Sequence, residues 1–309
     1  MIYEYALDPK VILKWLENDD YLSWIRSNHG MGIGTPRFIS TFPYQKKHKF
    51  LASIQRLKND ITDQKVIKRL DILYDFLSKN ELIERECAAL TQGEWSEKVI
   101  QEHNIEPFKA ILSSEPVNTK GCISFEKFHV SGLWTVPFQL SLQRTLSKFT
   151  AQIEPFIIAS SRTLIFADPY CYNEKAIKVI QTLLNSFLNK KNDKLPTVKI
   201  YYKLNEAHKN SASPNHVKSK LEEGLNDKAK KIKIIIMEVK ANEESDVFHN
   251  RYILNEFGGL HFGYGFDLSG KVDHTDEVTL LSKDVYDKRW TQFNHADMLE
   301  IVDKVEFGG

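Results

Sequence analysis

The spacing of hydrophobic positions differs between the first and the second part of the chain. In the first part, apolar residues recur every three or four positions, which is the period of an amphipathic helix. Asp8-Pro9 marks the start of the first predicted helix, because proline is favoured in a first helical turn. Further apolar residues with helical spacing are Leu51, Ile54, Leu57, Val66, Leu70, Leu73, Phe76 and Leu77. The pattern predicts a helical N-terminal domain over residues 1–118.

In the second part, short apolar runs alternate with helical stretches. We place the boundary within residues 116–121, where proline, asparagine and glycine cluster. Strands are predicted within residues 122–134, at 163–167, 197–204, 231–241 and 276–284, and helices at about 138–158, after 168, from 215 and at 284–299. Such alternation is typical of an α/β fold with a mixed, mostly parallel sheet flanked by helices. We assign this fold class to residues 119–309.

Two stretches of the N-terminal part allow more than one interpretation. Gly30, Gly32 and Gly34 could cradle a phosphate, but no strand is predicted before them, so a flexible connector is favoured. The basic run Lys46–Lys49 could contact a nucleic-acid backbone, although a solvated helix start is the commoner meaning of such a run.

Composition limits the classes of protein to consider. The 309 residues include 42 basic and 41 acidic side chains, so the net charge is close to zero. This argues against a protein that binds nucleic acid over its whole surface, although a local basic patch remains possible. Three scattered cysteines form neither a disulfide framework nor a zinc motif, which indicates a reducing compartment. No run reaches the roughly 18 apolar residues of a membrane span. We expect a soluble, cytoplasmic protein without a signal peptide.

The chemistry of the chain is predicted to centre on residues 247–267, which contain two short strands around a tight Gly-Gly turn. His249 and Arg251 are two residues apart, so in a strand they point to the same face, while Asn250 points away. A histidine can attack phosphorus or transfer a proton near neutral pH. A guanidinium can hold two phosphoryl oxygens at once. The pair therefore points to a phosphate ligand.

This stretch resembles the phospholipase D superfamily, whose signature is HxKxxxxD followed by a strand with GSxN. Counting from His249, Arg251 stands at the lysine position and Glu256 at the aspartate position. Tyr264 and Phe266 replace the serine and asparagine, which departs from the pattern. The closer resemblance is to the divergent branch named after the C-terminal domain of MIT (microtubule interacting and trafficking) proteins, with HxR and a later GxG[LF]D. Those residues are His249, Arg251, Gly263, Gly265, Phe266 and Asp267.

The resemblance implies a metal-independent phosphodiesterase that needs no cofactor. His249 would be the nucleophile, assisted by Arg251 and Glu256, and the resemblance implies a nucleic acid as the substrate. Only one motif is present, so two copies of His249 would have to meet across a homodimer. The resemblance implies a nuclease of a prokaryotic restriction or antiviral defence system, with a protein partner from the same multi-gene system.

Loss of the serine and asparagine leaves an alternative open. The domain would then be a degenerate module that binds an anionic lipid, a nucleic acid or a protein partner without cleaving it, since MIT-type relatives bind anionic phospholipids. Asp168 and Tyr170 follow a predicted strand, and ligands of α/β sheets bind at the carboxyl ends of strands. With Asn250, Tyr264 and Asp267, they complete the predicted substrate-binding residues. No set of metal ligands surrounds His249, so no metal is expected.

Overall fold

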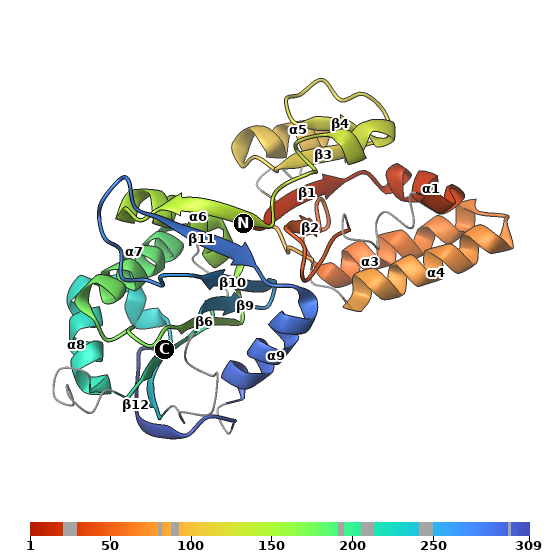
Figure 1. Cartoon of the computed structure of the whole chain (residues 1–309). Coiled ribbons are helices and arrows are strands. Elements are labelled where there is room, and N and C mark those ends of the chain that lie inside the picture. Colours follow the sequence, from red (N-terminus) through yellow and green to blue (C-terminus); the bar gives the residue numbers. More distant parts are fainter. Residues whose placement is uncertain are drawn as a thin grey trace. The chain divides into compact units, whose positions relative to one another are not determined.

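A computed structural model describes residues 1–20, 30–79, 82–87, 93–190, 195–204, 213–240, 250–295 and 298–309. The chain divides into two compact units, Ile2–Pro137 and Phe138–Gly309 (Figure 1). The division lies at Pro137, after the boundary predicted at residue 118. Cys122–Ser124, which was expected to open the second domain, is the strand β4 at the edge of the first unit's sheet.

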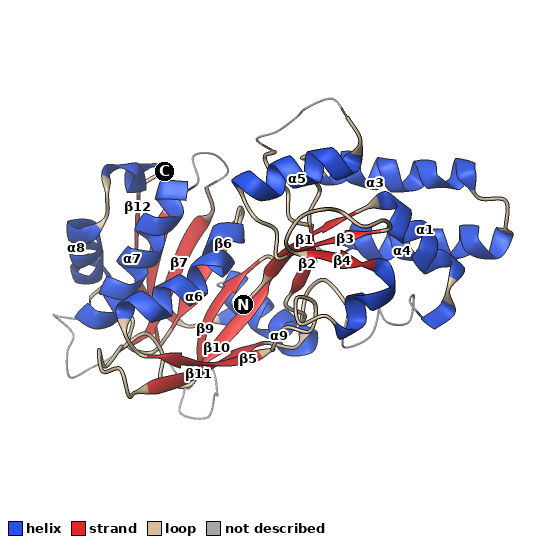
Figure 2. Ribbon diagram, turned by 90° about the horizontal axis from the view of Figure 1, so that it is seen from above, coloured by secondary structure: helices blue, strands red, loops and turns tan. Residues whose placement is uncertain are grey.

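The first unit is built around a parallel sheet with the strand order β2-β1-β3-β4 (Figure 2). Its elements are β1 (Tyr3–Leu7), α1 (Pro9–Glu17), β2 (Arg37–Ile39), α3 (Lys47–Arg56), η1 (Leu57–Asp60), α4 (Gln64–Lys79), α5 (Trp95–Ile105), β3 (Ala110–Ser113), β4 and η2 (Phe125–Val130). The prediction of a helical N-terminal domain is therefore wrong. These strands are three to five residues long, and β2 and β3 are buried throughout, so they show no alternation.

The helix starts and turns of this unit follow from local sequence. Asp8 caps α1, because its carboxylate Oδ1 accepts a hydrogen bond from the Lys10 N–H at 2.9 Å, as the Asp8-Pro9 pair predicts. The glycine-rich segment is a compact turn that leads into β2, in which the Gly32 N–H donates to the Arg37 carbonyl at 2.8 Å. Gly32 has a φ of 97°, a conformation that favours glycine. The glycines precede a strand, whereas a phosphate cradle would follow one.

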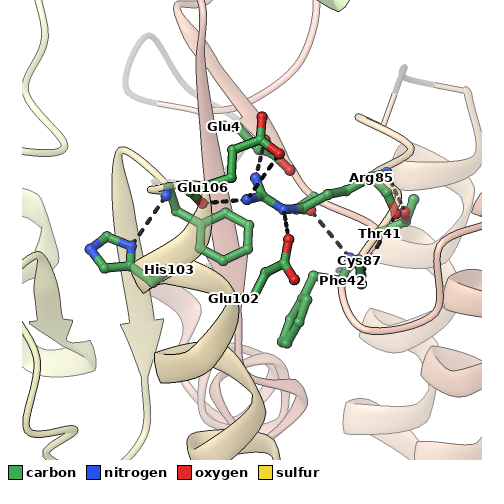
Figure 3. Close-up of polar contacts among 10 residues, drawn as sticks. Glu4, Thr41, Phe42, Arg85, Cys87, Glu102, His103 and Glu106 are labelled. Atoms are coloured by element: carbon green, nitrogen blue, oxygen red, sulfur yellow. Dashed lines mark hydrogen bonds and ion pairs between the residues drawn. The ribbon is translucent and has the colours of Figure 1, made fainter. Parts of the chain in front are cut away.

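The sheet of the first unit has an apolar core on each face. Tyr5 and Leu7 face the larger core with side chains of α1, α3 and α4, and Ala6 faces a smaller core with Phe42 and Val99. Beside the smaller core lies a cluster of charged residues around Arg85 (Figure 3). Its guanidinium donates to Glu102 at 2.7 Å and to Glu4 at 2.9 Å.

The second unit contains an eight-stranded sheet with the order β12-β8-β7-β6-β9-β10-β11-β5. Its elements are β5 (Gln139–Gln143), α6 (Leu146–Ala159), β6 (Thr163–Ala167), α7 (Glu174–Lys190), β7 (Thr197–Lys203), α8 (Pro214–Gly224), η4 (Asp227–Lys231), β8 (Ile234–Val239), β9 (Arg251–Asn255), β10 (Gly258–Phe262), β11 (Thr275–Leu280), α9 (Lys283–Asn294) and β12 (Ile301–Phe307). The helix predicted over 138–158 is thus a strand followed by a helix. The remaining strands and helices predicted after residue 160 are present.

The α/β class with a mixed sheet flanked by helices is confirmed, but the sheet is not mostly parallel. Among the described strands of this eight-stranded sheet, β6–β7 and β7–β8 pair in parallel, and the other five neighbouring pairs are antiparallel. Strands and helices also alternate from β5 to β6 and from β11 to β12, but only from β6 to β8 do the strands of this alternation pair with each other in parallel. The later strands β9, β10 and β11 follow one another without helices, so they pair antiparallel.

Helices cover both faces of the larger sheet. On one face, Phe149 of α6 packs against Phe262 of β10, with ring centroids 5.4 Å apart. On the other face, Phe293 of α9 packs against Tyr201 at 5.3 Å and Tyr252 at 6.3 Å. Arg251 pairs with Phe262 across the strands, so Arg251 belongs to the α6 face.

Candidate functional site

Three segments of the second unit meet at one end of its sheet. β9 runs antiparallel to β6 with Ala167 opposite Tyr252, so Asp168 follows β6 at the place where Arg251 begins β9. β10 runs antiparallel to β9 with Phe262 opposite Arg251, so the segment after β10 returns to the same end. We call Asp168, Tyr170, Arg251 and the segment Gly263–Asp267 the strand-end site.

Asp168 links the loops of this site through its buried carboxylate, which is 2% exposed. Oδ1 accepts a hydrogen bond from the Tyr170 N–H at 2.8 Å, and Oδ2 accepts one from the Phe266 N–H at 2.9 Å. Burial raises the pKa of Asp168, and the two N–H groups and Arg251 partly oppose this effect. The carboxylate therefore holds the loop after β6 and the loop after β10 together.

Arg251 is only partly satisfied by its surroundings. Nη1 donates to the Gly263 carbonyl at 2.9 Å, and Nε lies 3.9 Å from Asp168 Oδ2, too far for a hydrogen bond. Within the part of the chain that the structure describes, Nη2 makes no hydrogen bond. The side chain is 22% exposed, so a ligand can reach part of it.

Gly265 allows the loop after β10 to approach Asp168 and Arg251. Its φ is +75°, a conformation that L side chains rarely adopt. A Cβ atom at this position would lie 2.1 Å from Asp168 Oδ2 and 2.4 Å from Arg251 Cδ. Steric constraints therefore explain why the second position of the GxG motif is a glycine.

Asp267 and Asp276 hold the rest of this loop. The Asp267 carboxylate accepts a hydrogen bond from Asn173 Nδ2 at 3.4 Å and lies 3.4 Å from Lys175 Nζ, while its carbonyl accepts one from Arg144. Asp276 Oδ1 accepts hydrogen bonds from the N–H groups of Gly263 at 3.0 Å and Tyr264 at 3.1 Å. Burial raises the pKa of Asp276.

The strand-end site includes two exposed tyrosines. Tyr170 is 50% exposed and Tyr264 is 63% exposed. The Arg251 guanidinium lies 5.9 Å from the centroid of the Tyr170 ring, and that of Arg144 lies 4.7 Å from the Tyr264 ring. Each tyrosine is thus within range of a cation–π contact.

Glu256 lies far from the strand-end site. It lies in the turn after β9, and its carboxylate accepts hydrogen bonds from the Ser161 N–H at 2.7 Å and the Arg162 N–H at 3.1 Å. It follows Arg251 by five positions, which is roughly 17 Å along a strand. Glu256 fastens the start of β6 at the opposite end of the sheet, so its predicted catalytic role has no support in this geometry.

The turn itself also differs from the prediction. Glu256 and Phe257 form it, whereas Gly258 and Gly259 begin β10. Asn255 stabilises the turn, because its Oδ1 accepts a hydrogen bond from the Phe257 N–H at 2.9 Å. Packing explains Gly259, since a Cβ there would lie 2.6 Å from Leu254 Cδ2, whereas Gly258 has a φ of +152°, which L side chains rarely adopt.

The other predicted residues are placed as follows. His249 lies outside the described residues, and Asn250 stands directly before β9. Phe266 is fully buried between Phe166 and Phe262, with ring centroids 6.0 and 5.4 Å away. The described residues contain no group of three or more His, Cys, Asp or Glu that could hold a metal ion.

Sequence reasoning missed four participants, Arg144, Asn173, Lys175 and Asp276. None of them belongs to a motif, and Arg144 lies more than 100 residues before Asp267, whose carbonyl it binds. Their only signal was their position beside strand ends, which becomes informative once the strand order is known. His261 was also missed, but it packs against Tyr252 on the opposite face of the sheet, and burial lowers its pKa.

Comparison with known proteins assigns no family. The chain matches no family model, and no curated protein is significantly similar to it. Among solved structures, it is similar to TrmBL2, an archaeal chromatin protein whose structure shows a novel mode of DNA binding, with a TM-score of 0.33 and 11% identity. The match covers 56% of this chain and 56% of that chain, and its score is too low to assign a fold.

One further property concerns membranes. Among the helices in the described part of the chain, none is both long enough and apolar enough to cross a bilayer.

Proposed function

We propose that Phe138–Gly309 is a phospholipase D-like module that binds a phosphate-bearing ligand at the strand-end site without cleaving it. The observation that carries the proposal is the state of Arg251. Its Nη1 and Nε face Gly263 and Asp168, while Nη2 makes no hydrogen bond to any described residue. A phosphoryl oxygen would complete the hydrogen bonding of this guanidinium.

Binding is favoured over cleavage by the surroundings of Arg251. Phe266, at the position where the superfamily carries asparagine, is in the apolar core and cannot contact a phosphate. Tyr264, at the serine position, has its ring against Arg144 and is exposed. The site therefore lacks the amide of the superfamily's asparagine and has a tyrosine in place of its serine, while its cation is retained.

The second candidate is the metal-independent nuclease of a prokaryotic defence system. It is favoured by the spacing of His249 and Arg251, since the arginine of this pair begins a strand at the strand-end site. His249 would attack phosphorus, and a second copy of the chain in a homodimer would supply the other histidine. A protein partner from the same system belongs to this candidate.

Arg251→Ala tests the proposal, with Arg162→Ala as the matched control. Both variants remove one arginine, but Arg162 lies at the Glu256 end of the sheet. We expect Arg251→Ala to weaken binding of oligonucleotides or anionic vesicles by about 1–3 kcal/mol, because a charged hydrogen bond is lost. Arg162→Ala should bind like the parent. Equal affinity in all three proteins would refute the proposed role of Arg251.

Turnover separates the two candidates. Purified protein is incubated with DNA, RNA and phospholipid in EDTA, alongside His249→Ala. The binding module predicts no product with either protein. If the parent cleaves a substrate and His249→Ala loses several orders of magnitude in rate, the nuclease is correct.

A further inference from the structure

The strand-end site combines its cation with exposed aromatic rings, which a phosphate alone does not require. Among the described residues, the exposed large hydrophobic side chains include three aromatic ones, Phe138, Tyr170 and Tyr264. Two of these three border Arg251 and Arg144. Neither tyrosine hydroxyl makes a hydrogen bond to a described residue, and the Tyr170 ring, whose centroid lies 6.4 Å from that of Tyr172, remains half exposed.

The backbone that carries both tyrosines is held in place before any ligand arrives. Asp168 accepts hydrogen bonds from the Tyr170 N–H and from the Phe266 N–H, so one carboxylate fixes both loops. Asp276 accepts a further one from the Tyr264 N–H at 3.1 Å. A ring on a fixed backbone loses little conformational freedom when a ligand stacks on it.

The cations lie beside the rings. Arg251 is 5.9 Å from the Tyr170 ring, and Arg144 is 4.7 Å from the Tyr264 ring. An exposed ring next to a guanidinium offers a flat apolar surface and a positive charge within one short distance. A ligand that suits this surface has flat aromatic groups joined by anionic groups.

Single-stranded nucleic acid has this chemistry, because its unpaired bases expose their faces and each base is followed by a phosphate. In a duplex, the faces of the bases are covered by their stacked neighbours. A lipid headgroup would bind the arginine without contacting the tyrosine rings. We therefore propose that the strand-end site binds single-stranded nucleic acid, with a phosphate at Arg251 and bases stacked on Tyr170 and Tyr264. This inference rests on the proposed phosphate-binding function and names the ligand class of that site.

The test compares tyrosine variants that keep or lose the ring. Binding of a short fluorescent oligothymidylate is measured by anisotropy at low salt for the parent, Tyr170→Ala, Tyr264→Ala and the two Tyr→Phe variants. Each alanine variant should bind roughly 5- to 100-fold more weakly, the scale of a lost base–aromatic stack. The phenylalanine variants should bind like the parent, since the stacking surface remains. Circular dichroism checks that each variant is folded.

An abasic oligonucleotide of the same length separates stacking from phosphate binding. It keeps the phosphates and lacks the bases, so we expect weaker binding to the parent and no further loss on Tyr→Ala substitution. If Tyr→Ala leaves oligothymidylate affinity unchanged while Arg251→Ala reduces it, the stacking inference is overturned and the phosphate site stands.

Binding to anionic phospholipid vesicles is the third measurement of this test. Binding to vesicles in place of oligothymidylate, with loss on Arg251→Ala, would overturn the nucleic-acid inference and leave the proposed function intact. If the parent binds oligothymidylate, abasic strand and vesicles no better than Arg251→Ala does, both the inference and the proposed function fall.

Discussion

Each unit of the chain holds an arginine beside carboxylates, and the two guanidinium groups are bound in different ways. Arg85, in the first unit, is 3% exposed and donates to Glu102 and Glu4 and to the carbonyl of Glu106 (Figure 3). It also lies 4.1 Å from the centroid of the Phe108 ring. All three of its nitrogen atoms have partners.

Arg251, in the second unit, has a carbonyl partner at Nη1 and one carboxylate at 3.9 Å. The guanidinium chemistry is identical, so the difference comes from the surroundings. A buried arginine with every nitrogen occupied has no donor left for a ligand, and its removal would leave its carboxylate partners without a countercharge. Arg251 is 22% exposed and has hydrogen-bonding capacity left, so it is available to a ligand.

The largest expected effect comes from Arg85→Met. This change removes the positive charge next to Glu102 and Glu4 and should lower the free energy of unfolding by about 3–5 kcal/mol, the range for breaking a buried ion pair. Arg251→Met should lower it by about 1 kcal/mol or less. Urea denaturation of both variants measures the difference. Similar losses would mean that Arg251 is structural too, and the contrast between the units would fail.

A smaller effect is expected when an alanine is placed at Gly265. Its Cβ would collide with Asp168 and Arg251, and the residue has a φ of +75°, so we expect a loss of about 2–4 kcal/mol together with loss of phosphate binding. Gly270 is the matched control, because its φ is +74° and nothing lies within 4 Å of its Cβ position. Gly270→Ala should cost only about 1 kcal/mol and retain binding. Thermal unfolding and the anisotropy assay distinguish the two.

The smallest effect concerns pH and the Arg85 cluster. Burial raises the pKa of Glu4, against the opposing effect of Arg85, so the folded state holds the Glu4 proton more tightly than the unfolded state does. The stabilisation from this proton is complete below the ordinary carboxyl pKa and is lost as pH rises through the raised pKa. Glu4→Gln lacks this titration.

Urea unfolding of the parent and Glu4→Gln across that pH window measures the Glu4 contribution. The stability of the parent relative to Glu4→Gln should fall as pH rises. A difference between the two proteins that does not change with pH would show that Glu4 keeps the same pKa on unfolding.

The sequence allowed much of the second unit to be predicted, because its central strands are apolar runs of five to seven residues bounded by clear turns. Ile234–Val239 and Thr197–Lys203 are examples. It did not reveal β1, β2 or β3 of the first unit. A strand as short as Arg37–Ile39 is stabilised by its neighbours in the sheet and carries no periodic signal of its own.

The candidate site was partly predictable for a similar reason. Arg251, Asp168, Tyr170, Tyr264 and Asp267 follow from a strand motif and from the rule that ligands bind at strand ends. The role of Glu256 did not follow, because motif spacing does not say which end of a strand a residue reaches. Arg144 and Asp276 could be found only from the pairing of β5, β10 and β11.

The position of β6 between β7 and β9 has a consequence for the synthesis of the chain. β6 ends at Ala167, and its partner β9 begins at Arg251, so one edge of β6 stays open while more than 80 further residues are made. The Glu256 carboxylate that fastens residues 161 and 162 arrives later still. Contacts between segments so distant along the chain slow folding, and an open apolar strand edge can pair with another chain. Nascent chains that stop before residue 250 should therefore be prone to aggregation.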